Sequence, residues 1–543
     1  MATALLNEKG RIVIDAPFQQ STKMFCRSLP RSRWDVVRRQ WTCQATAATA
    51  WRILNGGIPD VQAGPAVEAL ASRFRMFTTL VTDQPPTRKL DSWKHQCEGY
   101  SFANGRAAGL LSMGMGSGKT KTVIDVVQNN LAPRSTFVLI LCPASVLGVW
   151  RREFRLFCAV PHDVLVLDKK QTVAKKVEVA ERFCNRPHGG IVAVVMNYEA
   201  SIRPEMLKWI TDRTWHTVIS DESHRLKTVT SKTSKAAAGL TSEFKWALTG
   251  TAFHNSPLDI YGQFQFLDPG LLDPSWSRFR NTYAVSGPFG ANHIVSYKNL
   301  EELAQRIAPM TFEVKTADLD LNLPPVQHVR QELNLPPKTM ALYYKLEQEL
   351  IADLHGGEVI TAPNALVKLL RLQQLTSGHV KPDDSDSIME VDSPKEGALL
   401  DLLDGMGGSP CVVFCKFKHD LDIVRRSAEK MGLEYGEVSG RHKCLTSDAK
   451  MPEGIDVLGV QIASGGVGID LTAAHYGVYF SVGHSLGDYE QSVARLDRPG
   501  QLHPVTFYHL VCTGTVDVAV YAALEDKADV VATVSNYLKD LKG

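Results

Sequence analysis

Two stretches of the chain share one pattern of hydrophobic and polar positions. Between residues 88 and 270, short apolar and β-branched runs such as Phe137–Leu141 and Ile191–Val195 alternate with segments of helical periodicity. The same alternation returns in residues 396–543, for example at Cys411–Phe414. Runs that are apolar on both faces and separated by helices are typical of parallel sheets covered on both sides. The pattern therefore predicts an α/β fold with two parallel-sheet lobes.

The rest of the chain follows other patterns. Residues 1–87 contain one alternating run, Arg11–Ile14, and a basic stretch, and they end in a double-proline linker at residues 85–86. These features predict a small N-terminal accessory domain. Residues 271–395 are less regular and include helical stretches such as Leu342–Leu354. We expect helical insertions and a connector there.

Size and composition agree with this division. The chain has 543 residues, several times the usual domain size of roughly 100–150 residues, so two to four domains are expected. Hydrophobic residues make up 44% and charged residues 22%, as in ordinary globular proteins. The net charge is only +2, so binding of a polyanion would depend on local basic surfaces.

The sequence contains no clear signal for a structural metal site, a disulfide or a membrane segment. Ten cysteines are scattered without a C-x-x-C pair, so neither structural zinc nor disulfides are expected. No apolar run reaches the ~18 residues that a membrane span needs. Residues Met1–Asp15 also lack the pattern of a secretory signal. We expect a cytoplasmic protein.

A glycine-rich segment, Gly114–Thr120, carries the strongest local chemistry. Small residues let backbone N–H groups wrap a phosphate at a helix N-terminus, while a following lysine reaches the terminal phosphates. The strict pattern has a glycine where this chain has Met113, but the G-x-G-K-T ending is intact. We therefore predict an ATP site that includes Gly116, Ser117, Gly118, Lys119 and Thr120, with the Thr120 hydroxyl as a ligand of Mg²⁺.

An acidic pair lies at the end of a predicted strand, 102 positions after Lys119. About three βα units of ~30 residues fit into that interval, so the pair can lie at the same sheet edge as the phosphate loop. One carboxylate, Asp221, can hold Mg²⁺, and the next, Glu222, can polarise the attacking water. Acidic strand ends are common, so this motif is weak when it stands alone. Together the two motifs predict ATP and Mg²⁺ as cofactors.

With these motifs in order, residues Leu90–Tyr521 resemble the Swi/Snf family of helicase superfamily two. The resemblance implies a motor with two RecA-like lobes, helical insertions and DNA as its track. It also implies that Gln96, twenty-three residues before Lys119, reads the adenine ring. Segments similar to the family's motifs Ia, Ib and III imply DNA contacts, although each alone is more often a strand end and loop. The implied DNA contacts are Pro143, Ser145, Asn197, Tyr198 and Asn255.

The segment Gln491–Gln501 is close to the family's motif VI, Q-x-x-x-R-x-x-R-x-G-Q. Residues three apart on one helix share a face, so Arg495 and Arg498 can point at one phosphate. Such arginines stabilise charge on the transferring phosphoryl group. The alternative, a solvated basic helix face, does not explain the flanking glutamines. The resemblance further implies that coupling between ATP and DNA uses His224, Thr249, Thr251, Gly468 and Gln491.

The chain departs from the family pattern at several positions. Ser223 replaces the alanine of the D-E-A-H tetrad, and Asp470 replaces the commoner asparagine of motif V. Residues Ser481–Ser485 stand where the family has an aspartate and a W-N-P-like turn. The coupling route through that loop is therefore expected to differ.

Phe18–Leu54 is similar to the HARP-type module that precedes some annealing members of this family. Its basic residues alternate with aromatic ones, a composition that can grip phosphates and stack on unpaired bases. The alternative is a small α/β module with a tryptophan core and solvated arginines. The residues concerned are Lys23, Arg27, Arg31, Arg33, Arg38 and Arg39, interleaved with Phe25, Trp34 and Trp41.

These observations favour a DNA-dependent ATPase that translocates on double-stranded DNA and acts in fork remodelling or strand annealing. Three alternatives remain open. They are a strand-separating DNA or RNA helicase, the motor subunit of a restriction system, and a nucleotide-gated DNA-binding scaffold without turnover. The compact chain resembles bacterial or phage members of the family more than the large chromatin remodellers.

Overall fold

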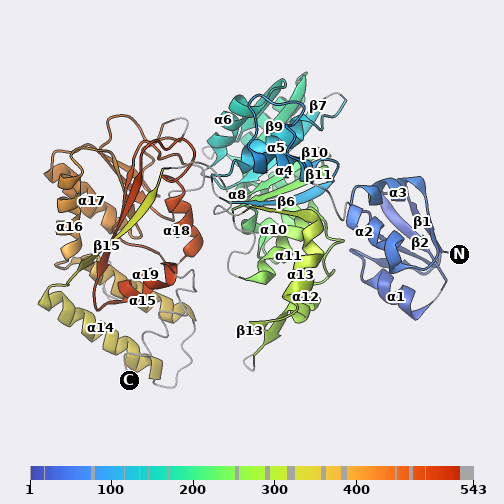
Figure 1. Cartoon of the computed structure of the whole chain (residues 1–543). Helices are drawn as coiled ribbons and strands as arrows, with labels where there is room; N and C mark the ends of the chain where they lie inside the picture. Colours follow the sequence, from blue (N-terminus) through green and yellow to red (C-terminus); the bar gives the residue numbers. More distant parts are fainter. Residues whose placement is uncertain are drawn as a thin grey trace. The chain divides into compact units, whose positions relative to one another are not determined.

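The computed structural model is shown in Figure 1. It describes residues 2–525 except 18, 75–79, 115, 134, 145, 168–170, 251–255, 288–293, 315–323, 356–361, 381–387, 447–448, 464–468 and 484. The chain forms two compact units, Met1–Leu319 and Asp320–Gly543. No helix within the described residues is long and apolar enough to cross a membrane.

The first unit begins with an α/β module around a five-stranded sheet of order β3-β4-β2-β1-β5. In β2, Ile12 and Ile14 are buried while Arg11 and Val13 are partly exposed, which is the period-two pattern of a strand with one covered face. The module therefore has its own core. Its elements are β1 (Ala2–Leu6), β2 (Arg11–Asp15), α1 (Gln20–Arg27), β3 (Arg33–Asp35), β4 (Gln40–Gln44), α2 (Ala47–Arg52), β5 (Val61–Ala63) and α3 (Pro65–Ser72).

A seven-stranded sheet of order β14-β6-β11-β10-β7-β9-β8 forms the centre of the first lobe. Every pairing in it is parallel, as the doubly apolar runs predict. The strands are β6 (Ala108–Met113), β7 (Ser135–Cys142), β8 (His162–Val166), β9 (Gly190–Asn197), β10 (Trp215–Asp221), β11 (Ser242–Thr249) and β14 (Thr311–Val314). The predicted runs at residues 137–141 and 191–195 lie within β7 and β9, so these predictions are confirmed.

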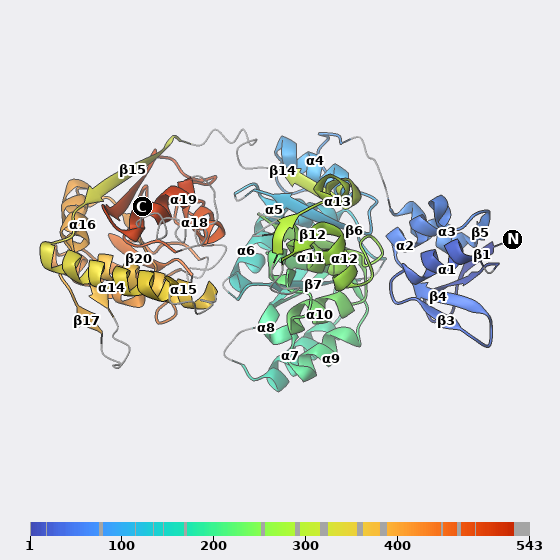
Figure 2. The same ribbon diagram turned by 90° about the horizontal axis from the view of Figure 1, so that it is seen from below.

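Helices pack around this sheet (Figure 2). They are α4 (Lys94–Ala103), α5 (Lys119–Gln128), α6 (Leu147–Phe157), α7 (Val173–Cys184), α8 (Tyr198–Ser201), α9 (Pro204–Thr211), α10 (Lys232–Gly239), α11 (Ile260–Leu267), α12 (Trp276–Tyr283) and α13 (Leu300–Ile307). A small antiparallel pair, β12 (Ala284–Ser286) and β13 (Ile294–Tyr297), follows α12. Since every strand ends at the same edge of a parallel sheet, the loops after β6, β7, β9 and β10 meet there.

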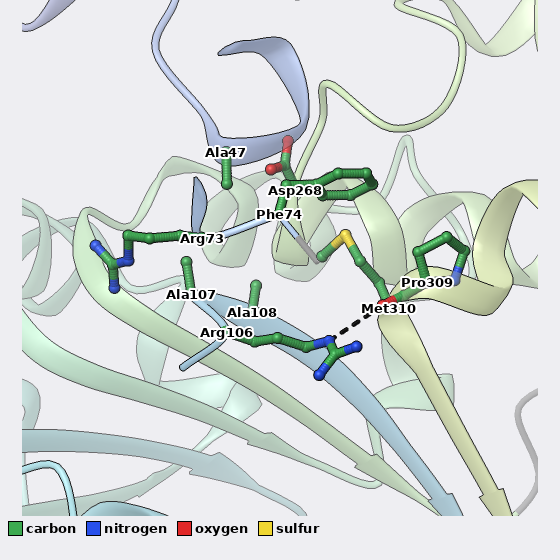
Figure 3. Close-up of a pocket in the computed structure, with 9 residues that line it drawn as sticks. All are labelled: Ala47, Arg73, Phe74, Arg106, Ala107, Ala108, Asp268, Pro309 and Met310. Atoms are coloured by element: carbon green, nitrogen blue, oxygen red, sulfur yellow. Dashed lines mark hydrogen bonds between the residues drawn. The ribbon is translucent and has the colours of Figure 1, made fainter. Parts of the chain in front are cut away.

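The accessory module packs against the first lobe through buried polar and apolar contacts. Oδ2 of Asp268, just after α11, accepts the backbone N–H of Ala48 at 2.9 Å, and Nη1 of Arg52 donates to the Gly270 carbonyl at 2.8 Å. A small cavity lies beside this contact (Figure 3). It is lined by Ala47, Arg73, Phe74, Arg106, Ala107, Ala108, Asp268, Pro309 and Met310. Alanine, phenylalanine and methionine dominate the lining, so this cavity is a packing gap between module and lobe.

The second unit is built on a six-stranded parallel sheet of order β15-β22-β21-β18-β20-β19. Its strands are β15 (Val326–Leu333), β18 (Cys411–Cys415), β19 (Tyr435–Val438), β20 (Val457–Gln461), β21 (Tyr476–Tyr479) and β22 (Val505–Cys512). The helices are α14 (Pro337–His355), α15 (Ala362–Thr376), α16 (Pro394–Gly405), α17 (Lys418–Lys430), α18 (Leu486–Val493) and α19 (Val516–Glu525). The short pair β16 (His379–Val380) and β17 (Met389–Glu390) lies between α15 and α16.

Strand β15 differs from the expected helical insertions and connector. It pairs with β22 along all of its residues, yet most of its side chains are exposed. An edge strand needs no continuous apolar run, so the polar sequence of β15 gives no sign of a strand. The predicted boundaries 88–270, 271–395 and 396–543 remain predictions, since the described units divide at residue 319.

Candidate nucleotide site

The phosphate loop connects β6 to α5 and contains two glycines with left-handed backbone. Gly116 has φ of 74° and Gly118 has φ of 79°, a conformation that favours glycine. A Cβ atom added to Gly118 would lie 2.2 Å from Nε2 of Gln96, so the Gln96 side chain would have to move for any other residue to fit. The chain then enters α5 directly, which leaves the first N–H groups of that helix available to an anion.

Polar groups of the loop are arranged as an anion site requires. Nζ of Lys119 donates to the carbonyls of Met113 at 2.8 Å and Gly114 at 3.2 Å, which holds the ammonium within the curve of the loop. The hydroxyl of Ser117 is buried and has no hydrogen-bond partner among the described residues. Thr120, the second residue of α5, is half-buried. A phosphate bound here would satisfy the Ser117 hydroxyl, whose burial without a partner is otherwise unfavourable.

Gln96 on α4 contacts the phosphate loop. Its Nε2 donates to the Ser117 carbonyl at 3.0 Å, and its Oε1 accepts the N–H of Trp93 at 3.0 Å. His95 Nε2 also lies 2.8 Å from the Ser117 carbonyl. The amide of Gln96 keeps one hydrogen and one lone pair for another partner. Recognition of adenine by Gln96 stays a prediction, while its hydrogen bond to the loop is a feature that the sequence did not show.

The acidic pair ends β10, and both side chains are buried. Oδ1 of Asp221 accepts the backbone N–H of Glu222 at 3.0 Å. Glu222 has φ of 50°, a left-handed conformation that is uncommon outside glycine and occurs at functional sites. Its Oε2 lies 3.2 Å from Nδ1 of His224. The turn after β10 therefore directs Glu222 and His224 toward each other.

Burial and mutual repulsion shift the two carboxyl groups apart in pKa. Burial raises the pKa of Asp221 to about 7, and the charge of Glu222 adds to this, while Lys119 opposes it. Burial also disfavours charged Glu222, but the hydrogen bond from His224 and the charge of Lys119 outweigh it and lower its pKa. A divalent cation would supply the positive charge that a buried carboxylate pair needs. Asp221 and the Thr120 hydroxyl offer oxygen ligands of the kind that Mg²⁺ prefers.

Two aromatic side chains hold Asp221: Trp150, which the sequence did not indicate as a site residue, and Tyr198, for which it implied a different role. Nε1 of Trp150 on α6 donates to Oδ2 of Asp221 at 3.0 Å, and Trp150 is fully buried. The hydroxyl of Tyr198 donates to the Asp221 carbonyl at 2.6 Å and lies 2.7 Å from Oγ of Ser220. No spacing of residues in the sequence predicts these contacts. They follow from the strand order β10-β7-β9, which brings the ends of three strands together.

The structure gives a different picture of the predicted DNA contacts. Tyr198 is only 1% exposed and its hydroxyl bonds to β10, so it supports the carboxylate strand, and its contact with DNA stays a prediction. Asn197 is buried and its Nδ2 donates to Oε2 of Glu199 at 2.7 Å. Pro143 is also buried. The two remaining predicted contacts, Ser145 and Asn255, lie outside the described residues.

The predicted coupling residues are only partly described. Thr249 ends β11 and is fully buried, whereas Thr251 and Gly468 lie outside the described residues. Ser223, which replaces an alanine of the family pattern, donates its buried hydroxyl to Oε1 of Gln263 on α11 at 2.7 Å. This departure therefore adds a hydrogen bond between the acidic motif and α11.

In the second unit, the arginines of the motif VI segment do not lie on a helix, and that prediction was wrong. Helix α18 contains Gln491 but ends at Val493, so Arg495 and Arg498 lie in the turns that follow. Pro499 disfavours helical backbone at the residue before it, and Gly500 has φ of 105°. Both residues disfavour a helix at Arg498, whereas nothing in the structure explains why α18 already ends at Val493.

The guanidinium of Arg495 is nevertheless buried. Arg495 is 3% exposed, and burial lowers its pKa to about 10. Its Nε and Nη1 have no acceptor among the residues that the structure describes. Arg498 donates from Nη1 to the Ile469 carbonyl at 3.3 Å. A buried guanidinium without acceptors is unfavourable, and an anionic ligand would compensate it.

The unusual segment Ser481–Gly483 is held inside the second unit. Oγ of Ser481 accepts the N–H of Lys416 at 2.7 Å and donates to Oδ2 of Asp420. Nε2 of Gln373 on α15 donates to the Val482 carbonyl at 3.2 Å. The segment thus links α15, β18 and α17 through buried hydrogen bonds.

Comparisons with known proteins agree with these motifs. The family of SNF2-related domains matches residues 78–379. An "Uncharacterized ATP-dependent helicase" of Mycoplasma pneumoniae is 26% identical over 454 residues, which is 81% of this chain and 42% of that protein. A "Putative protein p41" of Acyrthosiphon pisum secondary endosymbiont phage 1 is 27% identical over 75% of this chain and 90% of its own length. The chain thus spans less than half of the mycoplasma relative.

Two further matches are more distant. The chicken "DNA repair and recombination protein RAD54B" is 25% identical over 82% of this chain and 54% of its own length. The solved "Sulfolobus solfataricus SWI2/SNF2 ATPase core in complex with dsDNA" is 22% identical, with a TM-score of 0.39, over 83% of this chain and 95% of the solved one.

Proposed function

Because the chain belongs to the family of proteins with an SNF2-related domain, we propose that it is a DNA-dependent ATPase that translocates on double-stranded DNA. The observation that carries the proposal is a formed phosphate loop together with a buried carboxylate pair in one lobe. The Lys119 charge acts on both carboxyl groups, so the loop and the pair belong to one site.

In the proposed reaction, the N–H groups of the loop and α5 bind the phosphates of ATP, and Lys119 moves from loop carbonyls to phosphate oxygens. Asp221 and Thr120 would hold Mg²⁺, which neutralises charge on the phosphates when it is bound. Glu222 stays ionised at neutral pH because its pKa is lowered, so it can orient and polarise the attacking water. Arg495 is proposed to stabilise negative charge on the transferring phosphoryl group.

The finer role that we propose is remodelling of forks or annealing of strands in DNA replication, repair or recombination. The basic and aromatic composition of the N-terminal module supports this role, and the HARP-type resemblance of the module stays a prediction. A strand-separating helicase, an RNA-dependent ATPase, a restriction motor and a scaffold without turnover are the alternatives. The strand-separating helicase and the RNA-dependent ATPase can be distinguished by the nucleic acid that stimulates ATP hydrolysis.

ATP hydrolysis measured with duplex DNA, single strands, forked DNA and RNA tests the proposal. We expect duplex DNA to stimulate turnover most. Lys119→Ala and Glu222→Gln should each lower turnover about 100-fold or more, because each removes a group that acts in the chemical step. Matched controls are the exposed residues Lys175→Ala and Glu205→Gln, which should retain wild-type turnover. Wild-type turnover in Glu222→Gln would contradict the site assignment.

A further inference from the structure

The hairpin of β3 and β4 ends in an apolar tip that the described residues of the module leave uncovered. Val36 and Val37 are 76% and 93% exposed. Oδ1 of Asp35 accepts the backbone N–H groups of Val37 and Arg38, each at 3.0 Å, so the turn is well defined. Turns usually carry glycine, asparagine or aspartate, and two exposed β-branched residues have no role in forming this one. The tip therefore presents apolar surface on a fixed support.

Cationic and aromatic side chains surround this tip. The rings of Trp34 and Trp41, which pair across β3 and β4, lie 5.3 Å apart at 55°, and Trp34 is 40% exposed. Oδ1 of Asp35 is occupied by the backbone of the turn. Three arginines of the hairpin are exposed, and the described residues place no carboxylate in an ion pair with any of them. These arginines are Arg33, Arg38 and Arg39.

The module is anchored to the lobe that carries the phosphate loop. Besides the Ala48 N–H, the Asp268 carboxylate accepts the N–H of Gly270 at 2.8 Å. A Cβ atom on Gly270 would lie 2.4 Å from Oγ1 of Thr49, so the two surfaces fit without space for a side chain. Helix α11, which precedes Asp268, also carries Gln263, the partner of Ser223. One helix thus joins the acidic motif to the anchor of the module.

We propose that the β3–β4 hairpin is a wedge that inserts Val36 and Val37 at the junction between duplex and single-stranded DNA. Apolar residues inserted between base steps unstack them, exposed aromatic rings stack on unpaired bases, and arginines hold the adjacent phosphates. This inference rests on the proposed DNA translocation and names its substrate as a strand junction. An anionic membrane offers similar charge, but attachment to an ATPase lobe favours DNA.

The test uses the full chain and the double substitution Val36→Ser, Val37→Ser. Both side chains are exposed, so folding should be unaffected. The control is Val295→Ser, a 62% exposed valine on β13 of the first lobe. Binding is measured by fluorescence anisotropy on forked DNA, blunt duplex of equal length and single strands. A 2-aminopurine at the first base pair of the fork reports unstacking.

Wild type and Val295→Ser should increase 2-aminopurine fluorescence at the fork. The double variant should lose this increase and bind forks about tenfold more weakly, because two valine side chains no longer insert between bases. Its ATPase activity on blunt duplex should stay unchanged. A fork affinity equal to that of wild type, or equal losses on forks and blunt duplex, would overturn the wedge. Tip-dependent binding to vesicles of anionic phospholipid, with no junction effect, would overturn it as well.

The outcomes separate this inference from the proposed function. If no DNA stimulates the wild-type ATPase, the proposed function fails. If duplex DNA stimulates wild type and the double variant alike and the fork signals do not differ, only the wedge fails. A second variant, Arg33→Ala with Arg38→Ala, should weaken fork binding more at low salt than at high salt, as lost phosphate contacts require.

Discussion

Replacing Trp150 by phenylalanine tests how the site controls Asp221. The substitution removes the indole N–H that donates to Oδ2 of Asp221 at 3.0 Å and keeps a buried aromatic ring. A hydrogen bond to a charged group contributes about 1.5–3 kcal/mol, and 1.36 kcal/mol corresponds to one pH unit. The pKa of Asp221 should therefore rise by up to about one to two units above its value near 7.

The direction of the pH effect follows from this rise. The ionised form of Asp221 is the ligand for Mg²⁺, so activity appears as pH increases through its pKa. In Trp150→Phe the pH range over which kcat/KM rises should move to higher pH, so activity at pH 7 should decrease more than activity at pH 9. The profile is measured by ATP hydrolysis between pH 6 and 9, and the Mg²⁺ concentration for half-maximal ATP binding should rise.

Trp209→Phe is the matched control. Nε1 of Trp209 donates to Oε2 of Glu181 at 2.5 Å, so this variant also removes an indole–carboxylate hydrogen bond but on α9 and α7. It should leave the pH profile unchanged. Identical profiles for Trp150→Phe and wild type, in a folded protein, would refute the role of the indole.

Two further predictions concern the second unit. Arg495→Ala should bind ATP normally but lose about 10³-fold or more in hydrolysis, as other arginines that contact the transferring phosphate do. The control is Arg425→Ala, which changes an exposed arginine on α17. Weak ATP binding with normal turnover in Arg495→Ala would contradict the assignment. Burial raises the pKa of Asp420 to about 7. Between about pH 4 and 7 the folded chain therefore keeps a proton on Asp420 that the unfolded chain releases. The free energy of unfolding should fall as pH rises through this range. Asp420→Asn removes the titrating group and should weaken this dependence on pH. The free energy of unfolding of the variant minus that of wild type should be higher at pH 7.5 than at pH 5. An equal difference at both pH values would contradict the prediction.

Local sequence patterns predicted the parts of the fold that depend on neighbouring residues. The doubly apolar runs of β7 and β9 identify parallel strands, and the glycines at 116 and 118 supply the left-handed backbone of the phosphate loop. Strand β15 was missed because an exposed edge strand can be polar.

The contacts around Asp221 could not be read from the sequence. Trp150 and Tyr198 reach it only because β7 and β9 lie beside β10, and strand order is a property of the whole sheet. The placement of Arg495 and Arg498 on a helix was wrong, and for Arg498 the signal was present. Pro499 and Gly500 follow Arg498 directly and disfavour a helix there.

Displacement of a third strand from a DNA triplex tests the central claim most directly. A motor that moves along duplex DNA strips the third strand without separating the duplex. We predict displacement by wild type with ATP, and none with Glu222→Gln or with a non-hydrolysable ATP analogue. Duplex-stimulated ATP hydrolysis without any displacement, or displacement that continues in Glu222→Gln, would contradict translocation by this ATP site.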